Sequence, residues 1–81
     1  MSHDAGTSGV PNAVVNLAFE RDLSPMAAWR EHLGLTQSQV AASIGITQAA
    51  YAQMERARHP RTATLEKDSR AMGLIVVQLR W

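Results

Sequence analysis

Two glutamines, Gln48 and Gln53, are the side chains best suited to specific recognition, and they lie along one predicted helix. A glutamine amide can form two hydrogen bonds with an adenine edge, whereas alanine offers only a methyl contact to thymine. Successive residues of a helix are rotated by about 100° around its axis. The helix face opposite Tyr51 and Met54 therefore covers about 140° of the circumference. This face comprises Gln48, Ala49, Ala52, Gln53 and Arg56. We expect Gln48, Ala49 and Gln53 to contact bases in a major groove, although both glutamines could instead be solvated surface residues.

Three arginines, Arg56, Arg58 and Arg61, follow within six positions and have no acidic residue among them. Each phosphate that a guanidinium neutralises adds a salt-dependent term to DNA affinity. We therefore expect these arginines to contact the DNA backbone. Arg56 and Arg58 could also offset the negative end of the helix dipole.

The recognition face has to be positioned by residues 37–55, which contain two helical patterns joined at Gly45. The first pattern carries a core-facing apolar stripe, and the second carries a matching stripe formed by Tyr51 and Met54. Gly45 can adopt the left-handed conformation that closes a helix. Two short helices that meet at a glycine-containing turn form a helix-turn-helix arrangement. The first stripe consists of Val40, Ala41 and Ile44.

Capping signals place further helices around this motif. A first helix is predicted over residues 11–22, and Ser24-Pro25 predicts the start of a second. The residue before Pro60 should end the motif's second helix. The other predicted signals are a capping box of Thr36 and Gln39, caps at Thr47 and at Thr62 or Thr64, and closing glycines at Gly34 and Gly73.

The motif resembles the lambda-repressor-like (Xre-type) helix-turn-helix family. The resemblance covers about Ser24 to Leu74 and implies a compact, all-α, five-helix domain that binds double-stranded DNA. In this family, residues matching Gln37 and Gln48 commonly reach phosphate or base, so we add Gln37 to the expected backbone contacts. Thr47 is a further expected backbone contact. The residues that carry the resemblance are Gln37, Ala41, Gly45, Ile46, Tyr51, Met54, Glu55 and Arg56, preceded by Leu35-Thr36.

Two features depart from the family pattern. Tyr51 occupies a position where Ile or Val is usual, so its hydroxyl must reach solvent or a partner. Asp68 and Ser69 occupy positions where an apolar residue and Ala are usual, and the carboxylate must be exposed or paired.

Apolar segments at both ends of the chain exceed what the motif needs for support. Few base-reading side chains per protomer favour a homodimer on a palindromic operator. The tail 74–81 is β-branched and is expected to be extended or strand-like. A narrower resemblance to small antitoxins of type II toxin–antitoxin pairs implies a toxin as a protein partner. The expected dimer or partner interface comprises Val14, Val15, Phe19, Ile75, Val77 and Trp81.

Composition limits the other functions. The 81 residues allow one domain, expected over 10–81 with residues 1–9 disordered, and they include no cysteine. No constellation of side chains indicates catalysis, a metal site or a cofactor, and no apolar run is long enough to cross a membrane. We expect a cytoplasmic, nucleoid-associated protein that is not an enzyme. The alternatives are a repressor without a toxin, or an interaction module that has lost DNA binding.

Overall fold

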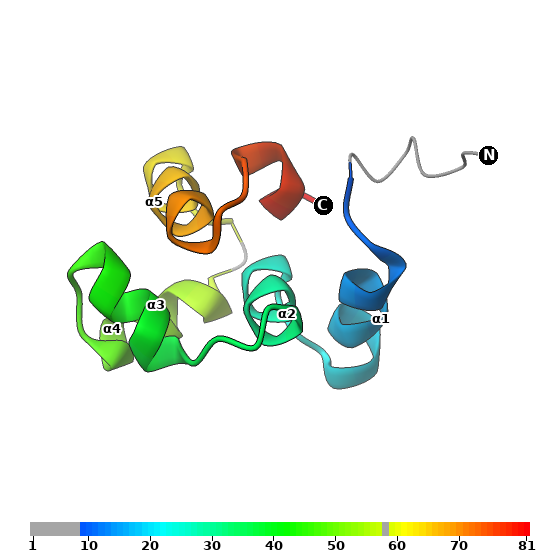
Figure 1. Ribbon diagram of the computed structural model, residues 1–81, viewed down its shortest axis with the longest axis horizontal. Helices are drawn as coiled ribbons and strands as arrows, with labels where there is room; N and C mark the ends of the chain where they lie inside the picture. The colour runs from blue at the N-terminus through cyan, green and yellow to red at the C-terminus, as the bar shows by residue number, and fades with distance from the viewer. Residues whose placement is uncertain (1–8, 58) are drawn as a thin grey trace.

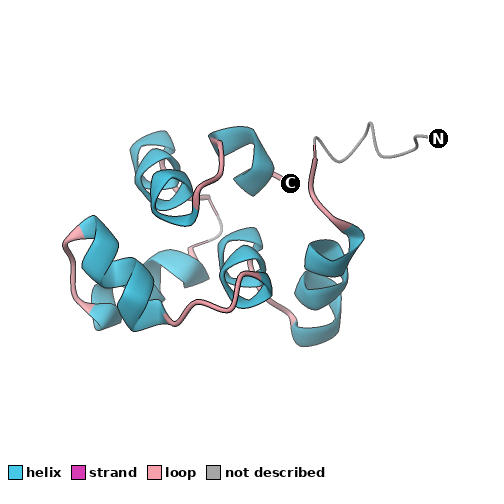
Figure 2. Cartoon of the chain, in the orientation of Figure 1, coloured by secondary structure: helices cyan, strands magenta, loops and turns pink. Residues whose placement is uncertain are grey.

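The computed structural model describes residues 9–57 and 59–81, and these residues form five α-helices and one short 3-10 helix (Figures 1 and 2). Of the segment 1–9 that is expected to be disordered, residues 1–8 lie outside the described residues. No strand occurs in the described ranges, and none of their helices is long and apolar enough to cross a membrane. The all-α, five-helix prediction is therefore confirmed. The elements are α1 (Asn12–Arg21), α2 (Pro25–His32), α3 (Gln37–Ile44), α4 (Gln48–Arg56), α5 (Thr62–Met72) and η2 (Val76–Leu79).

Side-chain caps start three of these helices, as their sequences predict. The hydroxyl of Ser24 accepts the N–H of Ala27 at 3.2 Å, and that of Thr47 accepts the N–H of Ala50 at 3.1 Å. The Thr36 hydroxyl accepts the Gln39 N–H at 3.0 Å, while the Gln39 side chain accepts the Thr36 N–H at 2.8 Å. These bonds satisfy N–H groups that have no partner within a helix.

A left-handed glycine links α3 to α4. Gly45 has φ +87°, a conformation that side chains disfavour, and its N–H donates to Ala41 O at 2.9 Å. The N–H of Ile46 also donates to Ala41 O, at 3.0 Å. This turn ends α3 and lets α4 begin three residues later, so the turn sets the angle of the second motif helix.

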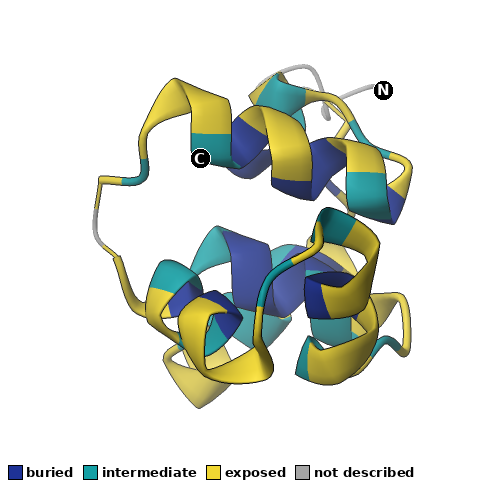
Figure 3. Cartoon of the chain, turned by 90° about the vertical axis from the view of Figure 1, so that its left-hand side faces the viewer, coloured by how far each residue is buried: buried dark blue, intermediate teal, exposed yellow. Residues whose placement is uncertain are grey.

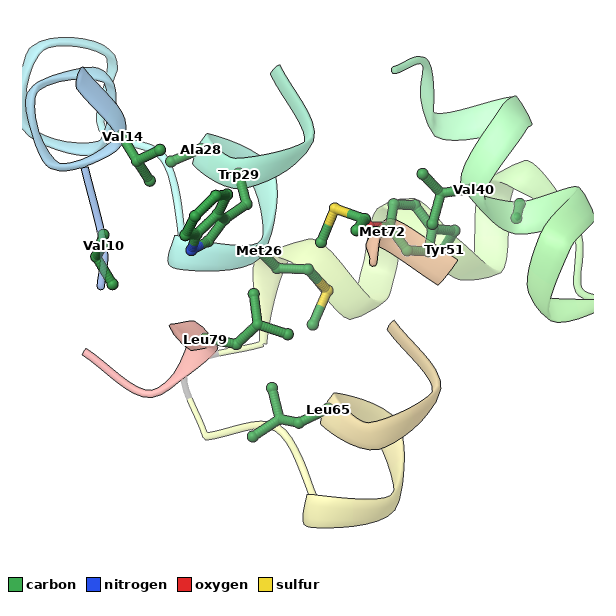
Figure 4. Close-up of a cluster of buried hydrophobic side chains, with 11 residues drawn as sticks. Val10, Val14, Met26, Ala28, Trp29, Val40, Tyr51, Leu65, Met72 and Leu79 are labelled. Atoms are coloured by element: carbon green, nitrogen blue, oxygen red, sulfur yellow. The ribbon is translucent and has the colours of Figure 1, made fainter. Parts of the chain in front are cut away.

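One apolar core joins all the helices (Figure 4). Val14 of α1 packs toward Ala28 and Trp29 of α2, while Tyr51 of α4 and Met72 of α5 lie near each other in another part of the core. Figure 3 shows the buried positions facing the interior between helices that are exposed on their outer sides. Burial of these side chains fixes α4 against the remainder of the domain. The other core residues are Val10, Met26, Val40, Ala41, Leu65 and Leu79.

The two departures from the family pattern meet in this core. Tyr51 and Asp68 are both fully buried, and the Tyr51 hydroxyl donates to Asp68 Oδ1 at 2.7 Å. The carboxylate is therefore paired, which is one of the two alternatives that the sequence allowed. Its other oxygen, Oδ2, is buried and has no hydrogen-bond partner among the described residues. Burial raises the pKa of Asp68 to about 6, although the hydrogen bond from Tyr51 opposes this shift.

The C-terminal tail corrects the sequence-based expectation of a strand-like segment. Ile75 is extended, but Val76–Leu79 form the 3-10 helix η2. The Gln78 side chain accepts the N–H of Ile75 at 3.0 Å, and the Trp29 indole N–H donates to Gln78 O at 2.7 Å. Leu79 is buried in the core. A β-branched tail needs a neighbouring strand to pair with, and the described part of the domain offers only helices.

Two helix starts also differ from the prediction. Pro11 is the N-cap of α1 and lies outside the helix, so α1 is one residue shorter at each end than expected. α5 begins at Thr62 with Arg61 in the N-cap position and has no side-chain cap. The expected threonine cap at Thr62 or Thr64 is therefore wrong, because Thr62 already has helical geometry and Thr64 lies within the helix.

Candidate nucleic-acid interface

α4 presents most of the predicted reading face to solvent. Tyr51 is its fully buried anchor, while Gln48, Ala49 and Gln53 are exposed. Arg56, at the last position of the helix, is also exposed. Ala52 is half-buried, so it belongs partly to the packing of the helix and only partly to this face. The three predicted base readers thus lie together on an accessible helix.

A chain of polar contacts leads from the interior to the start of α4. Glu55 accepts from Arg30 Nε at 2.5 Å and from Arg30 Nη2 at 3.3 Å. The amide of Gln37 donates to Glu55 Oε1 at 2.8 Å, and the amide of Gln48 donates to Gln37 Oε1 at 2.6 Å. The chain therefore joins α2, α4 and α3 and ends on the exposed side chain of Gln48.

This chain determines how the Gln48 amide is oriented. An ionised Glu55 can only accept hydrogen bonds, so Gln37 has to present its NH2 group to Glu55 and its carbonyl to Gln48. Gln48 in turn has to use one N–H for Gln37. Its second N–H and its carbonyl remain, and these are the two groups that an adenine edge requires.

The inner part of this series of polar contacts is an ion pair with little exposure to solvent. The side chain of Arg30 is 12% exposed and that of Glu55 is 6% exposed. Burial acts against the charge of Arg30, but the hydrogen bond and the charge of Glu55 outweigh it and raise the Arg30 pKa above its ordinary value. Arg30 also donates to Leu35 O at 2.9 Å, which ties the pair to the segment before α3.

Replacing Glu55 with glutamine should lower the free energy of unfolding by about 2 kcal/mol, because it leaves the Arg30 guanidinium with only the more distant carboxylate of Glu31, at 3.8 Å. The amide of Gln37 would also lose a charged acceptor. Urea unfolding measures the change. The exposed Glu66, replaced in the same way, is the matched control and should change stability by less than about 0.5 kcal/mol. Equal effects of the two substitutions would show that the ion pair does not hold α4.

Several predicted backbone-contact residues surround the start and end of α4. The Thr47 hydroxyl accepts the Ala50 N–H, so its own O–H is still able to donate to a phosphate. Gln37 is half-buried and bonded within the polar chain, while Arg56 and Arg61 are exposed. A shallow groove of about 760 Å³ is lined by Gln37, Ala52, Arg56 and the first residues of α2. The prediction for Arg58 lies outside the described residues.

The predicted protein interface divides into exposed and buried residues. Phe19 is 82% exposed, and Ile75, Val77 and Trp81 of the C-terminal segment are also exposed. Val15 is half-buried. Val14 is fully buried, so its place in an interface is corrected: it packs in the core because it lies on the side of α1 that faces α2. Figure 1 places α1 at the opposite end of the domain from α3 and α4.

The sequence prediction missed Arg30 and Glu55 as functional supports. In the sequence, Arg30 lies next to Trp29 and one helical turn after Met26. A charged residue at the edge of an apolar stripe has to find a partner when the stripe is buried, and this was the available signal. The partner is 25 positions away in the sequence, so no local pattern identifies it.

Comparison with known proteins agrees with this geometry. A helix-turn-helix family model, HTH_3, matches residues 26–74, which is more than half of the chain and extends from the second residue of α2 to just past the end of α5. No curated protein and no solved structure gives a significant match.

Proposed function

Since the chain belongs to the lambda-repressor-like helix-turn-helix family of DNA-binding regulators, we propose that it is a cytoplasmic, sequence-specific transcriptional repressor. The observation that carries this proposal is the contact between Gln37 and Gln48 at 2.6 Å, which holds the Gln48 amide at the exposed start of α4. A pre-oriented amide loses less conformational entropy when it binds a base edge. Gln53, five residues or about 1.4 turns further along the same helix, is the second base reader, and Ala49 contacts a thymine methyl.

Removal of both amides tests the base readers. We expect Gln48→Ala combined with Gln53→Ala to weaken binding to the operator by about 10²-fold or more, because each bidentate contact contributes about 1–3 kcal/mol of discrimination. Binding to unrelated DNA should change little. A gel shift on the chain's own promoter and on a scrambled duplex measures both affinities. Unchanged operator affinity in the double variant would contradict the assignment.

Arg56 is proposed to neutralise a phosphate. Replacing it with alanine should weaken binding to all sequences equally and reduce the log–log salt slope by about one unit. Arg70 offers a matched control, because it is an exposed arginine near the end of α5 and lies outside the proposed interface. An equal loss of slope in Arg70→Ala would contradict a specific role for Arg56.

The proposed repressor acts as a homodimer on a palindromic operator whose half-sites lie about 34 Å apart. Ile75 and Val77 support this proposal, since they are 62% and 47% exposed on the C-terminal segment. Large exposed apolar side chains that gather on one segment are typical of protein interfaces. Sedimentation of the wild-type chain and of Ile75→Asp tests the dimer, which should dissociate in the variant.

A second proposed role is that of an antitoxin whose partner is a toxin encoded beside it. Phe19 supports this role, because its side chain is 82% exposed on a helix that lies away from α4. A partner bound there would leave the DNA-reading face accessible. Co-expression with the neighbouring gene product tests the role, and Phe19→Ser should weaken the complex. The antitoxin role would be contradicted if the two proteins formed no complex, or if this chain did not relieve the toxicity of the neighbouring gene product.

A further inference from the structure

A cavity of about 370 Å³ lies between α2, α4, α5 and the C-terminal segment. Its inner surface includes Met26, Leu65 and Leu79, which come from three separate elements and are each 5% exposed or less. Figure 4 shows these three side chains converging on a shared space. The volume lies within the usual range for small-molecule pockets. An apolar lining is also typical of such pockets.

The rim of the cavity is more polar than its floor. Trp81 lines it with a partly exposed indole, and Arg80 and His59 lie beside it. Arg80 Nη2 donates to Thr62 Oγ1 at 2.8 Å, which restrains the guanidinium near the start of α5. A guanidinium has five N–H donors, so one bond to Thr62 leaves donors for an anionic group.

We propose that this cavity binds a small aromatic carboxylate. Its ring would pack against Met26, Leu65 and Leu79, and its carboxylate would receive hydrogen bonds from Arg80. Glu55 also lines the cavity, but its charge is offset by Arg30 at 2.5 Å. The rim therefore favours an anion, and the floor favours an apolar ring.

The cavity also contacts the end of the recognition helix. Met54 of α4 and Ala57, the residue that follows α4, both line it. A bound carboxylate would add negative charge near Arg56 and Arg61, which are proposed to bind phosphates. The ligand should therefore lower operator affinity by about two- to fivefold. This regulatory role rests on the proposed DNA binding, whereas binding of the ligand itself does not.

The first experiment titrates the full chain with 3-phenylpropanoate, followed by tryptophan fluorescence and by amide chemical shifts. We expect saturable binding with a dissociation constant on the order of 1 mM, given the few atoms of the ligand. The largest shifts should occur at Leu65, Leu79 and Trp81. The neutral analogue 3-phenylpropanamide should bind about threefold more weakly, because it lacks the charge that Arg80 recognises.

Three variants locate the site. Ala57→Trp fills the cavity from an exposed position and should abolish binding, whereas Ala63→Trp, at an exposed alanine outside the cavity lining, should leave binding unchanged. Arg80→Gln should remove the preference for the carboxylate over the amide. Absence of saturable binding, or binding that survives in Ala57→Trp, would overturn the proposed site. Urea unfolding of each variant verifies that it is folded.

The second experiment measures operator affinity with and without saturating 3-phenylpropanoate. A decrease in the wild type that is absent in Ala57→Trp supports regulation through the cavity. Ligand binding without a change in operator affinity would overturn the regulatory role alone. If the unliganded chain fails to bind DNA, the proposed function fails, and the ligand titration still decides whether the cavity is a binding site.

Discussion

Tyr51→Phe is expected to lower the free energy of unfolding by about 3 kcal/mol at pH 8, because it removes the hydrogen bond that the buried Asp68 carboxylate accepts from Tyr51. The phenylalanine ring fills nearly the same volume, so packing changes contribute little. Since the hydrogen bond from Tyr51 lowers the Asp68 pKa, its loss should raise that pKa further. Protonation would then relieve part of the destabilisation, so the effect should be smaller at pH 5.

A second substitution distinguishes a lost hydrogen bond from a lost contact. Asp68→Leu introduced into Tyr51→Phe removes the unpaired carboxylate and restores an apolar pair, so stability should recover. The double-mutant cycle should give a coupling energy of about 2 kcal/mol or more. If the double variant were as unstable as the sum of the single variants, the two residues would act independently and the pair would not anchor α4 to α5.

Stability should fall as the pH rises from about 4 to about 6, by about 3 kcal/mol from this group. The pKa of Asp68 is raised from 3.8 to about 6 by burial, so the native state binds this proton more tightly than the unfolded chain does. The native state is therefore favoured most below the unfolded pKa, and this contribution is lost as the pH passes through the folded pKa. Above that value the carboxylate is ionised, and its buried Oδ2 accepts no hydrogen bond within the described part of the chain.

Urea unfolding across this pH range measures the effect. Asp68→Asn is the reference variant, because it keeps an acceptor for the Tyr51 hydroxyl and does not titrate. Subtracting its profile from that of the wild type removes the contributions of the other carboxylates. A difference profile that is flat, or that rises with pH between about 4 and about 6, would contradict a raised pKa at Asp68.

Local signals in the sequence predicted most of the fold. The Thr36–Gln39 capping box, the Thr47 cap and the left-handed Gly45 each depend on residues within a few positions of one another. Such signals act before tertiary packing and can therefore be recognised in one sequence. The helices α3 and α4 together run from Gln37 to Arg56, and the stretch 37–55 in which these signals occur lies within that range.

Contacts between distant segments account for what could not be predicted. The tail forms a 3-10 helix because Trp29 bonds to Gln78 O and Leu79 enters the core, and both contacts depend on the assembled domain. The Tyr51–Asp68 pair spans 17 positions, and neither residue by itself indicates the other. The sequence predicted that each side chain needs either solvent or a partner, and only the fold identifies the partner.

The candidate site was predicted more completely than its support. Gln48, Ala49 and Gln53 could be placed on one face from helical periodicity alone, and all three are exposed. The contact that orients Gln48 runs through Gln37 and Glu55 to Arg30, across three helices. Periodicity does not report on contacts between helices, so the orientation of the amide becomes visible only in the structure.

Selection of binding sites from a pool of random duplexes tests the central claim most directly. A sequence-specific repressor of this kind should enrich an inverted repeat with adenine at the positions read by Gln48 and Gln53, and with half-sites about one helical turn apart. The Gln48→Ala and Gln53→Ala double variant should lose that preference while keeping salt-dependent binding. A pool that shows no enriched sequence with the wild-type protein would contradict sequence-specific recognition by α4.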